Sequence, residues 1–183
     1  GAEFASAYLA MGVPVTLISS RDRVMPHEDA DAATAIERVF RDRGMTILNN
    51  SRAAAAVRQG DGVTVTLTDG RQVTGSHVLM AVGSVPNTDA LGLAEYGVEI
   101  GDGGYVTADR VSRTNVPGIY AAGDCTGVQA LARVAAMQGR IAMWHALGEA
   151  VAPLRLRTVA ANVFTDPELA TVGVSQADVD TGR

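Results

Sequence analysis

The sequence contains a single cysteine and no long apolar run, and both shortages narrow its class. Cys125 has no second cysteine with which to form an internal disulfide, which fits a reducing compartment, so we expect a cytoplasmic protein. No apolar stretch approaches the roughly 20 residues that a membrane-spanning helix requires. The opening residues lack the basic stretch and cleavage pattern of a secretory signal, and we expect none.

A surplus of positive charge is also missing, because the formal net charge is −5. This charge gives no support for a nucleic-acid partner or for an anionic membrane surface. Apolar residues make up 47% of the 183 residues, which is typical of a globular chain with a core of its own and suits one or two domains.

Both ends of the sequence look cut. The chain opens at Gly1, directly before an expected helix, without a methionine or a preceding strand. It closes at Arg183, just after a new element begins. We therefore expect an internal fragment whose function belongs to a longer protein.

Hydrophobic spacing predicts alternating helices and strands with an antiparallel insertion. The expected helices are 2–11, 31–43, 131–147 and one from 174 onward, and the expected strands are 13–20, 45–48, 63–67, 72–74, 77–82 and 159–164. The sequence Thr68-Asp69-Gly70-Arg71 predicts a hairpin turn between two of these strands. The pattern favours a doubly wound α/β fold.

The most informative stretch is the run TNVPGIYAAGD at positions 114–124. Its apolar part, Gly118 to Ala122, predicts a short buried strand. Gly123 allows the backbone to approach a ligand closely because it has no Cβ. Asp124 would then place a carboxylate beyond the strand, where open α/β sheets bind ligands and where it can accept hydrogen bonds from sugar or ribityl hydroxyls. On spacing alone, a strand that ends in a turn with an Asp cap is an equal alternative.

A nucleotide site is expected at the other end of the chain. Gly1 would be the last glycine of a G-x-G-x-x-G fingerprint, and the ribose-reading position about 20 residues later falls on the run Ser19, Ser20, Arg21, Asp22, Arg23. A leading carboxylate would bind the ribose 2′-hydroxyl of NAD and repel a 2′-phosphate. Serines and arginines instead favour the phosphate, so we predict NADP as cofactor with NAD tolerated.

Two alternatives stay open in this half. Residues 21–23 can simply form a solvated loop, because Asp22 can pair with either arginine. Glu3 in the first turn of its helix is also explained by the helix dipole alone, an effect worth about 0.3–1 kcal/mol.

Five motifs in order resemble the pyridine-nucleotide disulfide oxidoreductases, the group of lipoamide dehydrogenase and glutathione reductase. They are GAE at 1–3, AVGSVPNT at 81–88, TNVPGIYAAGD at 114–124, LARVAAMQG at 131–139 and VFTDPELATVG at 163–173. Within that family the chain looks most similar to the lipoamide-dehydrogenase-like NAD(P)H quinone reductases of actinobacteria. The features that point there are GSVPN at 83–87, RVSRT at 110–114, VAAMQGRIAM at 134–143 and the lack of an acidic residue near Ser19.

The resemblance implies Rossmann-like FAD- and NAD(P)-binding domains followed by the start of an α+β dimerisation domain, and hence a homodimer. The implied division is 1–87 for the NAD(P)-binding domain, 88–155 for the C-terminal part of the FAD-binding domain and 156–183 for the interface domain. In such a protein, Asp124 would bond the ribityl chain of FAD, the helix start at Leu131 and Ala132 would face the flavin, and Glu3 would reach the nicotinamide carboxamide. The implied reaction passes a hydride from NAD(P)H to flavin and on to a small-molecule acceptor, expected to be a quinone.

We expect the cofactor-binding residues to be Gly1, Glu3, Ser19, Ser20, Arg21, Arg23, Ala53, Gly83, Gly123, Asp124, Leu131 and Ala132. We expect no catalytic residue and no metal site in this stretch, because Cys125 has neither a resolving cysteine nor an evident base. One alternative is dihydrolipoyl dehydrogenase or another disulfide reductase on the same scaffold, with a cysteine pair upstream and a His-Glu pair downstream. An alternative of another class is a flavin-free NADP-binding regulatory module.

Overall fold

The computed structural model describes residues 1–182, which form two compact units. The first unit contains residues 1–82 together with the residues from 160 onward, and the second contains residues 83–159. The three-domain division expected from the sequence is a different partition, and it stays a prediction.

The first unit begins with an α/β arrangement. Helix α1 (Ala2–Ala10) leads to strand β1 (Thr16–Ile18), helix α2 (Ala30–Asp42) and strand β2 (Thr46–Leu48), and the two strands pair in parallel. The side of α2 that carries Ile36 and Phe40 is buried, and both side chains pack in one cluster with Met45 and Ile47. These elements confirm the expected helices and the expected parallel strands, with β1 shorter than the run 13–20.

An antiparallel sheet of three strands follows. Strands β3 (Ala53–Gln59), β4 (Gly62–Leu67) and β5 (Gln72–Gly75) pair in sequence order, and the hairpin turn before β5 is confirmed. Gly70 has φ +86° and donates its N–H to the carbonyl of Leu67, a backbone conformation that favours glycine. Strand β3 was not expected, because its alanines are exposed and show no alternation.

The expected buried strand at 77–82 is wrong. This segment is extended but pairs with no other strand, and Val78, Leu79, Met80 and Val82 are between 44% and 85% exposed. An apolar run becomes a buried strand only where a neighbouring strand pairs with it and other elements cover its side chains. Within residues 1–182 no strand pairs with this segment, and its apolar side chains stay exposed.

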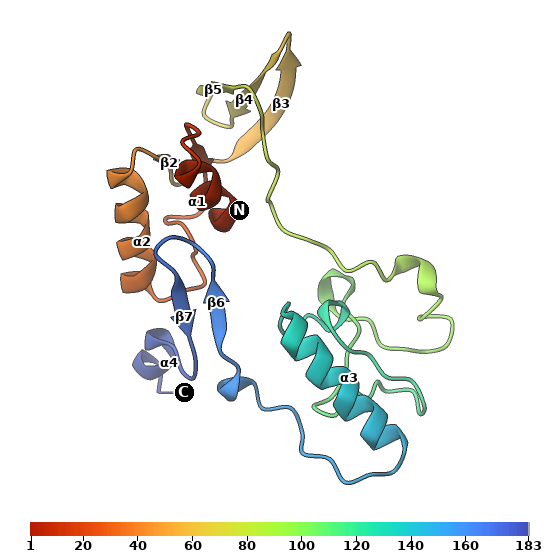
Figure 1. The fold of residues 1–183 in the computed structure, drawn as a ribbon. Helices are drawn as coiled ribbons and strands as arrows, with labels where there is room; N and C mark the ends of the chain where they lie inside the picture. Colours follow the sequence, from red (N-terminus) through yellow and green to blue (C-terminus); the bar gives the residue numbers. More distant parts are fainter. Residues whose placement is uncertain (183) are drawn as a thin grey trace. The chain divides into compact units, whose positions relative to one another are not determined.

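The last elements of the chain also belong to the first unit. Strands β6 (Ala161–Val163) and β7 (Leu169–Thr171) form an antiparallel pair, which lies beside α2 in Figure 1. Leu169 of β7 joins the cluster around Phe40, and Arg43 forms an ion pair of 2.7 Å with Asp166 in the loop between the two strands. Helix α4 (Gln176–Asp180) confirms the expected late helix and starts with a capping box.

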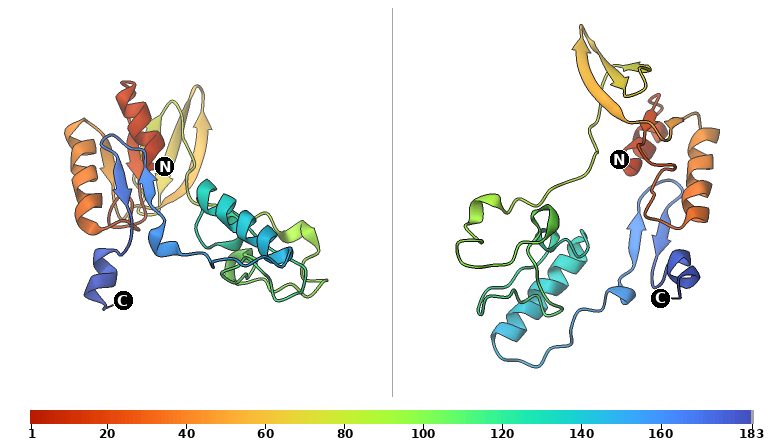
Figure 2. Two further views of the ribbon diagram at one scale, coloured as in Figure 1. Left: turned by 60° about the horizontal axis from the view of Figure 1, so that its bottom comes forward. Right: turned by 180° about the vertical axis from the view of Figure 1, so that it is seen from behind.

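The second unit is built from loops around a single α-helix in its described residues, α3 (Ala132–Ala146), which confirms the helix expected at 131–147 (Figure 2). Its small core contains Val98, Val106 and Ala121. The expected strand Gly118–Ala122 is wrong, because only Tyr120 pairs, through an isolated bridge to Arg113. Within residues 1–182, no helix combines the length and apolar character needed to cross a membrane.

Candidate cofactor sites

The turn after β1 is fixed by the residues that follow β2. Ser19 N–H donates to the carbonyl of Leu48 at 2.9 Å, and Ser51 N–H donates back to the carbonyl of Ser19 at 2.8 Å. The carbonyl of Arg21 accepts from the N–H of Asn50 at 2.8 Å. These main-chain bonds continue the parallel pairing of β1 and β2 and hold the expected ribose-reading residues at the carboxyl end of the strands.

Within this turn, Asp22 selects one of the two arginines. Its Oδ2 lies 3.0 Å from Nη1 of Arg23, and the Arg23 side chain is 31% exposed. The exposed Arg21 side chain has no ion-pair or hydrogen-bond partner within residues 1–182. Nε of Arg23 is buried and likewise lacks an acceptor among these residues. The turn therefore offers one unneutralised guanidinium and one unsatisfied buried donor, which suits an anionic group.

A carboxylate network that the sequence did not predict supports this turn from beneath. Glu37 on α2 accepts hydrogen bonds from Val24 N–H at 3.2 Å, from Asn49 Nδ2 at 2.8 Å and from Arg41 Nη2 at 2.7 Å. Burial on its own would raise the pKa of the Glu37 carboxyl, but these three donors and the charge of Arg41 together lower that pKa below its ordinary value. The Glu37 carboxylate thus links α2 to Val24, which follows the turn, and to Asn49, which follows β2.

Gly1 and Glu3 have structural contacts of their own. A Cβ added at Gly1 would lie 3.3 Å from Cβ of Ala81, so the start of α1 packs closely on the segment 77–82. The Glu3 carboxylate accepts a hydrogen bond from Phe164 N–H at 2.8 Å. That bond is a stabilising role for one carboxylate oxygen, and the nicotinamide role of Glu3 stays a prediction.

In the second unit, the Gly123–Thr126 turn presents Asp124. Gly123 has φ +91°, and a Cβ there would lie 3.3 Å from Cβ of Ala135 on α3. Asp124 opens the short 3₁₀ helix Asp124–Thr126 and is exposed. Its carboxylate has no hydrogen-bond partner within residues 1–182, so it is available to hydroxyl donors of a ligand.

A buried glutamine within the motif at 131–139, for which the sequence predicted no role, holds this turn against α3. Gln138 is 3% exposed, and its Oε1 accepts from Gly123 N–H at 2.7 Å. Its Nε2 donates to Oγ1 of Thr126 at 3.2 Å, and that hydroxyl donates to the carbonyl of Gly123 at 2.8 Å. The signal in the sequence was a polar residue among the apolar positions of a helix, although spacing alone could not identify its partners.

The start of α3 provides two further donors. Leu131 precedes the helix without a side-chain cap, and the N–H groups of Ala132 and Arg133 have no acceptor in the described part of the chain. The first turn contains no acidic residue. Free amides at a helix start favour acceptor or anionic groups, so this end and the free carboxylate of Asp124 together fit a hydroxyl- and acceptor-rich cofactor.

Two expected site residues, Ala53 and Gly83, show no contact or free polar group that points to a cofactor. Ala53 is the exposed first residue of β3 and pairs with Leu67. Gly83 has φ +116°, a backbone conformation that favours glycine, but nothing lies within 4 Å of an added Cβ, so no close approach requires glycine there. Cofactor contacts of both residues stay predictions.

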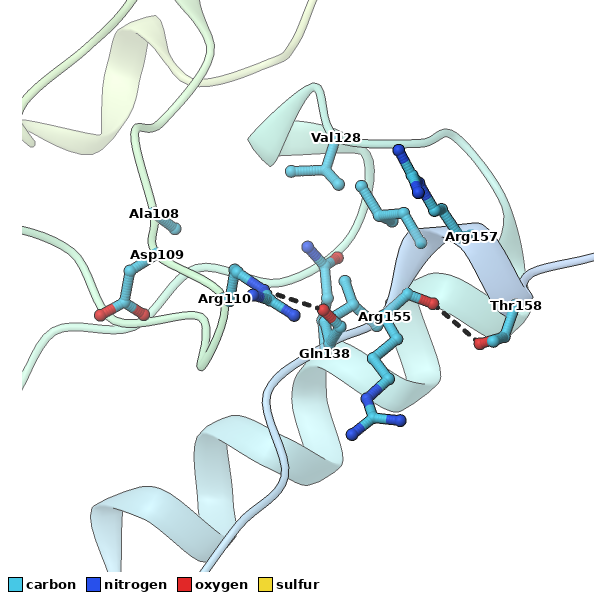
Figure 3. Close-up of a pocket in the computed structure, with 10 residues that line it drawn as sticks. Ala108, Asp109, Arg110, Val128, Gln138, Arg155, Arg157 and Thr158 are labelled. Carbon is cyan, nitrogen blue, oxygen red and sulfur yellow. Dashed lines mark hydrogen bonds between the residues drawn. The ribbon is translucent and has the colours of Figure 1, made fainter. Parts of the chain in front are cut away.

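The second unit also contains a pocket of about 490 Å³ (Figure 3). It is lined by Ala108, Asp109, Arg110, Val128, Gln138 and residues 154–158. Arg110 donates through Nε to the carbonyl of Leu154 at 3.2 Å, which holds the segment before residue 156 against the unit. Gln138 therefore lines the pocket and also binds the Gly123 turn. The expected flavin-site residues Gly123, Asp124, Leu131 and Ala132 do not line the pocket.

A family model described as pyridine nucleotide-disulphide oxidoreductase matches residues 1–139. The chain belongs to this family, which confirms the resemblance and the mixed α/β fold expected from the five motifs.

Individual relatives carry different names. The chain is 62% identical over 182 residues to a protein of Mycobacterium tuberculosis named NAD(P)H dehydrogenase (quinone), a match that covers 100% of this chain and 37% of the relative. It is 36% identical over 181 residues to a dihydrolipoyl dehydrogenase of Bacillus subtilis, with 97% of this chain and 38% of the relative covered.

The chain is also similar to solved structures. The crystal structure of LpdA from Mycobacterium tuberculosis matches with a TM-score of 0.94 at 62% identity, over 99% of this chain and 39% of that chain. The flavoprotein disulfide reductase RclA from Escherichia coli, as a Cu(II) complex, matches with a TM-score of 0.88 at 27% identity, over 97% of this chain and 41% of that chain. The chain thus spans about two fifths of the length of the relatives that it matches.

Proposed function

We propose that the full-length protein is an FAD-dependent NAD(P)H quinone reductase. In the overall reaction, NAD(P)H and one proton reduce a quinone to its hydroquinone, with NAD(P)⁺ as the second product. The observation that carries this proposal is the free, exposed carboxylate of Asp124 after Gly123, in a chain 62% identical to a protein named NAD(P)H dehydrogenase (quinone).

The first unit would bind the nicotinamide nucleotide. Ser19 and Ser20 would donate hydrogen bonds and Arg21 a positive charge to the 2′-phosphate of NADPH. Arg23 would contribute less, because Asp22 already neutralises part of its charge. The same turn lacks a carboxylate at its first position to bind the ribose 2′-hydroxyl, so NADH would be tolerated but would bind more weakly than NADPH.

The second unit would bind the flavin. Asp124 would accept hydrogen bonds from ribityl hydroxyls, and the amides of Ala132 and Arg133 would donate to acceptor atoms of the ring system. Flavin supplies hydride-accepting and electron-donating chemistry when it is bound. The residues described here orient the cofactors, and no side chain among them moves a proton in the proposed reaction.

A disulfide acceptor is the second candidate. The 36% identity to a dihydrolipoyl dehydrogenase of Bacillus subtilis favours this candidate, because relatives with either name match the same chain. We further propose a homodimer, since the last elements of the chain resemble the start of the family's interface domain. We also propose a cytoplasmic location, since the single cysteine fits a reducing compartment.

The test is a steady-state comparison of electron acceptors with the purified full-length protein. NADPH and NADH would each be offered with a benzoquinone, a naphthoquinone and lipoamide. We expect quinone reduction with a kcat/KM at least 10-fold above that for lipoamide. A preference for lipoamide would overturn the quinone assignment, and a protein without bound flavin would overturn the whole proposal.

A further inference from the structure

We propose that Gln138 is a positioning residue for flavin binding, acting through the Gly123–Thr126 turn rather than by touching the cofactor. This inference rests on the proposed function, because it assumes that the turn carrying Asp124 faces the flavin nucleotide. No motif assigns such a role to this position, and the geometry of the described residues carries it.

The first step is the closure of the hydrogen-bond ring. Three bonds link Gln138, Gly123 and Thr126 at 2.7, 3.2 and 2.8 Å. The N–H of Gly123 can only donate, so the atom that faces it must be the amide oxygen of Gln138, and the orientation of the side chain follows from that bond. Each member of the ring therefore has one chemically defined role.

The second step is burial. Gln138, Gly123 and Thr126 are all buried, and Gln138 is 3% exposed. Hydrogen bonds are stronger in such an environment, and a donor that loses its acceptor there is costly. If Gln138 lost its amide, the Gly123 N–H would lose the side-chain acceptor that it has within residues 1–182, and the turn would move to find another.

The third step is how the Asp124 carboxylate is positioned. Asp124 itself has no side-chain partner in the described chain, so its position depends on the backbone on either side. On the C-terminal side, that backbone is held by the bond from Val106 N–H to the carbonyl of Cys125 at 2.8 Å. On the side of Gly123, it is held by the ring and by the close approach of Gly123 to Ala135. Gln138 and Ala135 lie one turn apart on α3, so the helix that begins at Ala132 also sets the position of the Asp124 carboxylate.

The test measures FAD dissociation constants by titrating apoprotein of the full-length chain. Gln138→Leu removes the ring at similar volume, Gln138→Glu keeps an acceptor for Gly123 N–H, and Thr126→Val removes the hydroxyl. Met137→Leu is the matched control, because Met137 is the neighbouring, 41% exposed residue on the same helix.

We expect Gln138→Leu to raise the dissociation constant of FAD by roughly 10-fold, because a buried donor loses its acceptor. Gln138→Glu should stay within about 3-fold of the parent, and Met137→Leu should be unchanged. The double variant Gln138→Leu/Thr126→Val should be no weaker than Gln138→Leu alone, since both changes open one ring. Saturating FAD should restore kcat, with the KM for NADPH unchanged.

The inference is overturned if Gln138→Leu binds FAD as Met137→Leu does, or if Gln138→Glu loses as much affinity as Gln138→Leu. Should Gln138→Leu fail to fold, unchanged FAD affinity in Thr126→Val overturns it instead. Loss of affinity in Asp124→Asn without loss in the ring variants would remove the role of Gln138 and leave the proposed function standing. A parent protein that binds no FAD would remove both.

Discussion

Asp22 and Arg23 form an ion pair with 3.0 Å between Oδ2 and Nη1, while the neighbouring Arg21 has no anionic partner within residues 1–182. The sequence did not show which of the two arginines Asp22 pairs with, and the ion pair now distinguishes them. Exposed ion pairs contribute little to stability, so its main consequence is for charge: Arg21 keeps its full charge for a ligand, whereas that of Arg23 is partly compensated.

Arg21→Ala should therefore weaken NADPH more than NADH. A charge-assisted bond to a phosphate is worth about 1.5–3 kcal/mol, so we expect the KM for NADPH to rise at least 10-fold and that for NADH to stay within about 2-fold. Arg23→Ala, measured in the same steady-state assay, should have the smaller effect. Equal changes for both nucleotides, or a larger effect of Arg23→Ala, would contradict the assignment of Arg21 to the 2′-phosphate.

Asp124→Asn should reduce flavin retention in the full-length protein. The amide keeps the size of the side chain but removes the charge that strengthens hydrogen bonds from hydroxyls, so we expect the FAD dissociation constant to rise about 10-fold. The matched control is Asp102→Asn, another exposed aspartate that opens a 3₁₀ helix in the same unit. Undiminished visible flavin absorbance after gel filtration would show that Asp124 is a turn residue only.

Glu37→Gln should alter the pH dependence of stability. The folded pKa of Glu37 lies below its ordinary value of 4.5, so its stabilisation is fully present above pH 4.5 and is lost as the pH falls through the lowered folded pKa. At pH 7 we expect Glu37→Gln to lower the free energy of unfolding by about 1–3 kcal/mol, because three donors face a weaker acceptor. Toward pH 3 the difference should shrink.

The measurement is the thermal midpoint between pH 7 and pH 3, with Glu168→Gln as control, an exposed carboxylate in the same unit. A difference between Glu37→Gln and the parent that stays constant over this range would contradict the lowered pKa.

Gly127→Ala should destabilise the second unit. Gly127 has φ +65°, and a Cβ there would meet the ring of Tyr105 at 2.8 Å, so the substitution adds a clash to backbone strain. Gly118→Ala, at φ +83° with nothing within 4 Å of the added Cβ, isolates the strain. We expect about 1–2 kcal/mol for Gly118→Ala and a further 1–3 kcal/mol for Gly127→Ala, from urea unfolding. Equal losses would show that Tyr105 moves aside freely.

The sequence predicted the elements whose pattern is local. Helix α2 has apolar residues at helical spacing, and the turn before β5 has the glycine that its backbone conformation favours. Strand β3 was not predicted, because exposed alanines have low strand propensity and its extended conformation depends on pairing with β4. For the segment 77–82 a strand was predicted and none formed, since an apolar run does not show whether a neighbouring strand covers it.

The same division holds for the candidate sites. Asp124 and the Ser19–Arg23 turn could be found from motifs and spacing. The side chains that hold them, Gln138 and Glu37, could not, because the bonds by which each reaches its turn join residues more than ten positions apart in the sequence. Buried polar contacts of this kind depend on tertiary packing, which periodicity does not encode.

Rapid mixing of the full-length protein with NADPH in the absence of oxygen, followed by a quinone, tests the central claim most directly. We predict that the flavin absorbance bleaches with NADPH and returns on addition of the quinone at least 10-fold faster than on addition of lipoamide. A protein whose visible spectrum does not respond to NADPH, or whose absorbance returns only with the disulfide, would contradict the account.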